Sequence, residues 1–190
     1  MNLVGNDVVD LDEPQAAESH TRERYVARVC TEDERERLSR AVDKRVSFWS
    51  HFAAKEAAYK VAAKLGLRRG FAHKLFDVSE DLKSVWFGEL QLQLELQIDG
   101  ARIHALAWTA QKPQWGLGLV RDEARAGEVA REGLLHALGD EALLVERKSA
   151  PGSWDGYAPP KVMKGASELP IDVSLSHDGR FAAWAWVKSA

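Results

Sequence analysis

Two segments near the start of the chain carry side chains suited to metal and phosphate chemistry. Residues 5–10, Gly-Asn-Asp-Val-Val-Asp, place Asp7 in an otherwise apolar stretch, where a carboxylate is costly to bury unless it is paired or bound to a cation. In residues 48–60, Glu56 and Lys60 are four positions apart and so share one face of a predicted helix. A carboxylate and an ammonium group one turn apart could hold a metal ion and a phosphate side by side.

A third segment, 174–179 with the sequence Ser-Leu-Ser-His-Asp-Gly, sets Ser176 and His177 where a predicted strand meets a turn. Hydroxyl and imidazole groups at such a junction suit anion binding. A Ser-His-Asp triad is a poor interpretation, because adjacent strand residues point to opposite faces. Taken alone, each segment is better explained by an ordinary structural role: a capped turn for the first, a surface ion pair for the second and a polar turn for the third.

The elements that must position these residues begin with a strand over 3–11. Thr31 to Glu34 form a capping-box pattern, which predicts a helix over 32–41. Asp43 can cap a longer helix over 44–65, which Gly66 ends. Residues 19–29 suggest one further short helix.

The middle of the chain has a period of two. Residues 89–98 alternate polar and apolar side chains without a break, which predicts a strand with one wet face. Asp99-Gly100 supplies a hairpin turn before a return strand over 101–110. With a further strand over 115–120, residues 71–121 are expected to form an antiparallel meander.

The last third is predicted to begin with a helix over 122–138 that closes at Gly139. A strand near 143–147 follows, then a loop over 149–170 that is rich in Pro and Gly. Strands over 171–176 and 181–187 complete the chain. The fold class is α+β, with antiparallel sheets packed against long helices.

Composition excludes several classes of protein. The 190 residues contain 26 Lys plus Arg and 29 Asp plus Glu, for a net charge of −3, which argues against bulk nucleic-acid binding. One cysteine, Cys30, permits no internal disulfide or cysteine-based zinc site. The first residues lack a signal-peptide pattern, and no stretch approaches the roughly 18 apolar residues of a membrane helix. We therefore expect a cytoplasmic protein without membrane contact.

Together, the three segments and their order resemble those of the 4′-phosphopantetheinyl transferase superfamily. Residues 5–10 are similar to its first motif, a Gly-x-Asp followed by an apolar residue and a nearby acid. Residues 48–60 resemble the second, in which a Trp is followed after five residues by Lys-Glu-Ala and a further Lys. Residues 174–177 resemble the hydroxyl–His motif that contacts coenzyme A.

The resemblance implies an enzyme that moves phosphopantetheine from coenzyme A to a serine of an acyl or peptidyl carrier protein, releasing adenosine 3′,5′-bisphosphate. Asp7 and Glu56 match the ligands of Mg²⁺, which prefers oxygen ligands. Lys60 would pair with a phosphate oxygen, and Glu56 would also orient or deprotonate the serine hydroxyl.

Nucleotide phosphates would be contacted by Ser176 and His177, with Lys161 as a further basic residue for coenzyme A. The surfactin-type class has a second acid two residues after the first, where this chain has Val9. Asp10 should face the other way and is expected to be structural.

Chain length suggests a pseudo-dimer of two halves, as in the surfactin-type class. In that class the half with the hydroxyl–His motif comes first, whereas here it comes last, so the order of the halves is expected to be swapped. Residues 1–121 would carry the acidic motifs and the meander, and residues 122–190 the Ser-His motif. A monomer is the favoured assembly, and a homotrimeric one-unit synthase with an inserted meander is the competing one. The alternatives in function are a non-catalytic module that binds coenzyme A or a carrier protein, and a hot-dog-like thioesterase.

Overall fold

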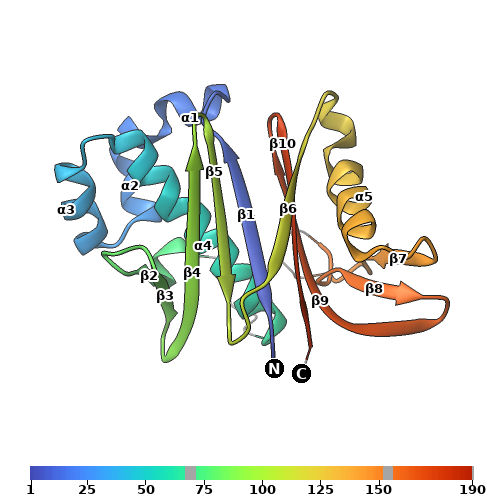
Figure 1. Cartoon of the computed structure of the whole chain (residues 1–190). Helices are drawn as coiled ribbons and strands as arrows, with labels where there is room; N and C mark the ends of the chain where they lie inside the picture. The colour runs from blue at the N-terminus through green and yellow to red at the C-terminus, as the bar shows by residue number, and fades with distance from the viewer. Residues whose placement is uncertain (67–71, 152–155, 190) are drawn as a thin grey trace.

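Two antiparallel sheets of five strands each are built from successive parts of the chain (Figure 1). The computed structural model describes residues 1–66, 72–151 and 156–189. The first sheet has the order β1-β5-β4-β3-β2 and the second β6-β10-β9-β8-β7. The strands of the first sheet are β1 (Val4–Asp10), β2 (Phe76–Val78), β3 (Ser84–Phe87), β4 (Leu90–Asp99) and β5 (Arg102–Trp108). Those of the second are β6 (Gln114–Leu119), β7 (Leu143–Glu146), β8 (Lys161–Lys164), β9 (Ser167–Asp178) and β10 (Phe181–Lys188). The α+β class is confirmed.

The two sheets share one connectivity. Each starts with a strand, continues to a long helix, and ends with four strands whose last returns beside the first. The long helix is α4 (Lys44–Lys64) for the first sheet and α5 (Ala126–Leu138) for the second. Three shorter helices precede α4, namely α1 (Pro14–Glu18), α2 (Glu23–Val29) and α3 (Glu32–Arg40).

Local signals in the sequence place the helix ends. Thr31 accepts a hydrogen bond from the Glu34 amide, and the Glu34 carboxylate accepts one from the Thr31 amide, which is the predicted capping box of α3. Asp43 accepts from the Val46 amide at the start of α4. Gly139 ends α5 with φ of 72°, a conformation that favours glycine.

Helix α4 lies against β1 at unusually short range. A Cβ on Gly5 would stand 1.9 Å from the Ala57 carbonyl oxygen and 3.2 Å from the Lys60 Cβ. Only glycine permits this approach, because it has no side chain to separate the two backbones. The contact brings the α4 face that carries Lys60 directly over the acidic segment of β1.

The second face of β1 packs against the second sheet. Val4, Leu106 and Trp108 form a buried apolar cluster with Ala185 and Val187 of β10. The two chain ends lie side by side in Figure 1, and Asn2 Nδ2 donates to the Lys188 carbonyl at 2.9 Å. The sheets are therefore joined through β1, which belongs to one and contacts the other.

Two predictions about the strands are wrong. Residues 115–120 were expected in the first meander, but β6 pairs with β10 and so belongs to the second sheet. The expected loop over 149–170 includes β8 and the start of β9, while its residues 152–155 lie outside the described part of the chain. The Pro and Gly residues of this stretch misled the prediction, because Gly165 lies in the turn between β8 and β9, and Pro170 lies within β9 itself.

Across residues 1–66, 72–151 and 156–189, none of the helices combines the length and apolar character needed to cross a membrane.

Candidate active site

Side chains from three elements meet around Asp7 of β1. Lys60 Nζ of α4 lies 3.1 Å from Asp7 Oδ1 and donates to the Asn6 carbonyl at 2.7 Å. The Ser176 hydroxyl of β9 donates to the same Oδ1 at 2.9 Å. The structure thus brings together Asp7 and Ser176, which are more than 160 positions apart in the chain, in a contact that the sequence analysis did not predict.

The environment of Asp7 disfavours its charged form. Burial raises the pKa of Asp7 from 3.8 to about 6, Lys60 opposes this shift, and the negative charge of Glu56 adds to it. A carboxylate that is buried near another is a site where a cation is stabilising. The raised pKa of Asp7 is therefore typical of a functional position.

Glu56 lies one turn before Lys60 on α4, and 13% of its side chain is exposed. Its Oε1 is 3.3 Å from Nε2 of His73, which belongs to a short 3₁₀ segment, His73–Leu75. His73 was not singled out from the sequence, since it lies outside the three motifs. Glu56 is thus partly open to solvent and in contact with a residue from outside its own helix.

Lys55, next to Glu56 in the second motif, has a different task. Its Nζ lies 2.5 Å from Glu34 Oε2 and 2.9 Å from the Val29 carbonyl, and both charged side chains are fully buried. Glu34 Oε1 also accepts from the Val78 amide at 3.0 Å. This pair ties α2, α3 and β2 to α4. The capping-box pattern singled out Glu34 in the sequence but not its ion pair, because Lys55 is 21 residues away in the chain.

Ser176 and His177 lie on opposite faces of the second sheet. Ser176 is 7% exposed and faces Asp7, whereas His177 is exposed on the side of α5. A Cβ on Gly127 of α5 would lie 3.7 Å from Arg131 Nη2 and 4.0 Å from His177 Nε2. Burial lowers the pKa of His177, and Lys60 and Arg131 lower it further. Arg131 is a cation near this site that the sequence motifs do not contain.

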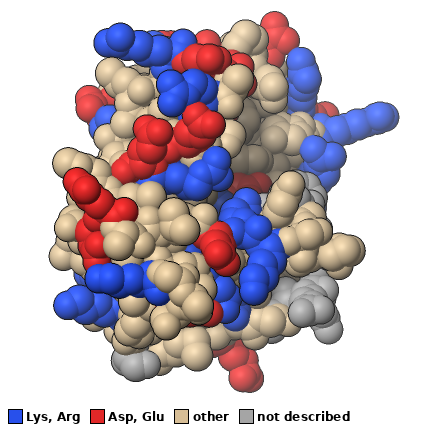
Figure 2. Space-filling view, turned by 90° about the vertical axis from the view of Figure 1, so that its right-hand side faces the viewer, with Lys and Arg blue, Asp and Glu red and all other residues tan. Residues whose placement is uncertain are grey.

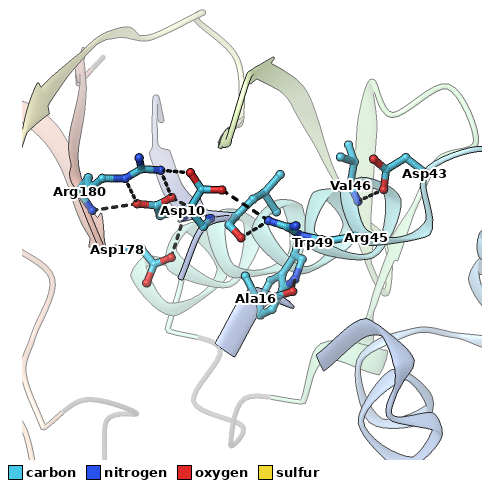
Figure 3. Close-up of polar contacts among 10 residues, drawn as sticks. Asp10, Ala16, Asp43, Arg45, Val46, Trp49, Asp178 and Arg180 are labelled. Atoms are coloured by element: carbon cyan, nitrogen blue, oxygen red, sulfur yellow. Dashed lines mark hydrogen bonds and ion pairs between the residues drawn. The ribbon is translucent and has the colours of Figure 1, made fainter. Parts of the chain in front are cut away.

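Asp10, at the end of β1, is bound by Arg180 of the turn between β9 and β10 (Figure 3). Arg180 Nε and Nη2 each lie 2.7 Å from one oxygen of Asp10, which gives a two-pronged contact. The Asp10 amide donates to Asp178 at 2.8 Å. Asp10 therefore fastens the turn between β9 and β10 to the end of β1, in agreement with the structural role expected for it.

A family model described as the 4′-phosphopantetheinyl transferase superfamily matches residues 3–111, which is more than half of the chain. The chain belongs to the 4′-phosphopantetheinyl transferase superfamily. The match ends in the connection between β5 and β6, so it covers the first sheet with its helices. The second sheet lies outside it.

One curated member of this superfamily is similar over a shorter stretch. A holo-acyl-carrier-protein synthase of Phenylobacterium zucineum (strain HLK1) is 42% identical over 67 residues. These residues are 35% of this chain and 48% of the synthase, so the alignment spans about half of the synthase.

The donor set fits a divalent cation held by few protein ligands. Asp7 and Glu56 offer carboxylate oxygens, and the contacts of Asp7 with Lys60 and Ser176 both engage Oδ1. Within the described ranges, no group of three or more His, Cys, Asp or Glu is placed to hold a metal ion. Two carboxylates suit Mg²⁺, since Mg²⁺ commonly keeps water and phosphate oxygens as its other ligands.

Lys161 lies on β8, paired with Asp172 of β9. Its Nζ lies 2.5 Å from Glu168 Oε2, and about half of each side chain is exposed. A small cavity beside it is lined by Glu146, Lys148 and Pro159 among others. The role of Lys161 in coenzyme A binding stays a prediction.

Proposed function

We propose that this protein is a Mg²⁺-dependent transferase that moves 4′-phosphopantetheine from coenzyme A to a serine of an apo acyl or peptidyl carrier protein. The convergence of Asp7, Lys60 and Ser176, with Glu56 close enough to shift the Asp7 pKa, carries the proposal. Membership of the superfamily and the similarity to a holo-acyl-carrier-protein synthase support it.

In this reaction the carrier serine oxygen attacks the phosphorus that bears pantetheine. The bond from that phosphorus to the oxygen of the adenosine phosphate breaks, and adenosine 3′,5′-bisphosphate leaves. Positioning and charge neutralisation carry most of the catalysis in such transfers. Asp7 and Glu56 would hold a Mg²⁺ ion, which would supply positive charge to the diphosphate.

The chain's own residues divide the remaining work. Lys60 provides a fixed positive charge beside Asp7 for a phosphate oxygen. Glu56, partly exposed and one helical turn away, accepts the proton of the carrier serine directly or through water. His177 and Arg131 contact the nucleotide phosphates from the side of α5.

The same connectivity in both sheets supports a pseudo-dimer of two halves. The half with the acidic motifs comes first, so we propose the swapped order and a monomeric, cytoplasmic protein. The face of α5 and β7–β9 in Figure 2 mixes Lys and Arg with Asp and Glu, which fits a small-molecule and protein partner better than a nucleic acid.

The decisive experiment mixes the protein with coenzyme A, Mg²⁺ and apo-carrier proteins of fatty acid, polyketide and peptide synthesis. Intact mass spectrometry should show one carrier gaining a phosphopantetheine group. We expect Glu56→Gln to lower the rate by at least about 100-fold while the protein stays folded. Glu36→Gln, which alters a carboxylate exposed on α3, serves as the matched control.

Two outcomes would contradict the proposal. Coenzyme A binding without transfer to any carrier would favour the non-catalytic module. An unchanged rate in Glu56→Gln would remove the role assigned to that carboxylate.

A further inference from the structure

The outer edge of β1 is covered by side chains of β9 instead of another strand. Its outward amides donate to side-chain oxygens that lie 168 positions later in the chain. These contacts are Val4 to Asp172 at 2.7 Å, Asn6 to Ser174 at 2.9 Å, Val8 to Ser176 at 3.1 Å and Asp10 to Asp178 at 2.8 Å. We call Asp172, Ser174, Ser176 and Asp178 the β9 acceptor row.

Two lysines of α4 complete the same edge on its carbonyl side. Lys64 Nζ donates to the carbonyls of Val4 at 2.6 Å and Val173 at 2.7 Å. Lys60 Nζ donates to the Asn6 carbonyl at 2.7 Å and lies 3.5 Å from that of Leu175. The register of β1 against β9 is therefore set from both sides, since a shift would separate every donor from its acceptor.

Ser176 differs from Ser174 in where its own proton goes. Both hydroxyl oxygens accept an amide of β1, and both residues are buried. A hydroxyl has one hydrogen to donate. In Ser176 this hydrogen goes to Asp7 Oδ1 at 2.9 Å, whereas in the described part of the chain the Ser174 hydroxyl contacts the Asn6 amide.

We propose that Ser176 is a positioning residue for Asp7. Its hydroxyl, oriented by the Val8 amide, holds Oδ1 together with Lys60 and leaves Oδ2 as the oxygen for a divalent cation. The inference rests on the proposed function, and it replaces the nucleotide contact expected for Ser176. The second sheet thereby completes the acidic site of the first, and the β9 acceptor row sets the register in which it does so.

The test measures metal binding without any substrate. Mn²⁺ is titrated into the protein free of coenzyme A, and electron paramagnetic resonance follows the unbound Mn²⁺. We expect Ser176→Ala to bind Mn²⁺ about tenfold more weakly, the effect of one hydrogen bond to a charged group. Ser174→Ala, which loses only the amide contact, should keep the affinity of the unaltered protein.

Urea unfolding of both alanine variants shows that they fold, and Ser176→Thr, which keeps the hydroxyl, should restore Mn²⁺ affinity. Coenzyme A binding measured in the presence of a chelator should be the same in Ser176→Ala and the unaltered protein. If Ser176→Ala loses affinity for coenzyme A but binds Mn²⁺ as the unaltered protein does, the positioning role is overturned and Ser176 is a phosphate ligand.

A failure of the proposed function gives a different pattern. If the unaltered protein binds no Mn²⁺, both the metal site and this inference are wrong. If Mn²⁺ is bound equally by the unaltered protein and Ser176→Ala, the positioning role alone is wrong. A tenfold difference in a protein that modifies no carrier would support the positioning of Asp7 and contradict only the transfer reaction.

Discussion

At the scale of the residue, Asp7 shows how a functional group opposes folding. It is buried beside a second carboxylate, and one lysine and one hydroxyl do not offset the cost of its charge, so its pKa rises to about 6. Folding therefore favours the protonated form of Asp7. The contribution of Asp7 to stability therefore falls as the pH rises from about 4 to 6, because the unfolded chain releases this proton before the folded one does.

We expect Asp7→Asn to stabilise the protein at pH 7 by about 2 kcal/mol, since the amide keeps the size of the side chain without its charge. At pH 4 the variant and the unaltered protein should differ little. Urea unfolding at both pH values measures this, with the exposed Asp77→Asn as control. A variant that is less stable at pH 7 would show that Asp7 contributes more by its ion pair with Lys60 than it costs.

At the scale of the element, the approach of α4 to β1 decides whether the site exists. Gly5 lets the helix backbone touch the strand, and the buried Lys55–Glu34 pair joins the same helix to α3. Trp49 Nε1 of α4 donates to the Ala16 carbonyl at 3.0 Å, and this contact joins α4 to α1 (Figure 3). The motif residues around Glu56 therefore serve mainly to place one helix.

We expect Gly5→Ala to lower the free energy of unfolding by about 3 kcal/mol, because its Cβ would meet the Ala57 carbonyl at 1.9 Å and the backbones must separate. Mn²⁺ affinity should fall with it. Gly133→Ala is the comparison, since its Cβ would meet the Trp184 ring at 2.3 Å, in the second sheet. Equal Mn²⁺ affinity in both variants would show that the position of α4 does not govern the site.

At the scale of the whole molecule, the two sheets meet around a buried histidine. His104 of β5 is fully buried, its ring lies 5.1 Å from that of Trp115 on β6, and its Nε2 is 3.4 Å from Asn6 Nδ2. Burial lowers the pKa of His104 to about 4, and Arg102 and Lys60 contribute to the same shift. The junction of the two sheets therefore holds an uncharged imidazole.

We expect the contribution of His104 to stability to be greatest above pH 6.5 and to fall toward pH 4, opposite in sign to that of Asp7, because the unfolded chain binds a proton at His104 that the folded chain does not bind. The shift corresponds to about 3 kcal/mol over this range. His104→Phe should lose this contribution and so lose less stability on acidification than the unaltered protein does, whereas the exposed His136→Gln should keep the pH dependence of the unaltered protein. Urea unfolding between pH 7 and 4.5 measures the slopes, and an unchanged slope in His104→Phe would contradict the assignment.

Several features could be predicted because their causes are local. The capping box at Thr31, the cap at Asp43 and the alternation in residues 89–98 each depend on neighbours in the chain, and the structure contains the elements that they indicate. The resemblance predicted that Asp7 and Lys60 belong to one site, but the ion pair between them was not predicted. The strand over 115–120 was assigned to the wrong sheet, because a strand's partners are not encoded in its own pattern.

The sequence by itself determined where most helices and strands form, and the family resemblance that it carries predicted which acidic and basic residues belong to one site. Tertiary structure alone decided that Ser176 faces Asp7 while His177 faces α5. It also decided that Arg131 lies near His177 and that Arg180 binds Asp10. These contacts join residues far apart in the chain, and their geometry depends on how two sheets pack, for which no short stretch of sequence carries a signal.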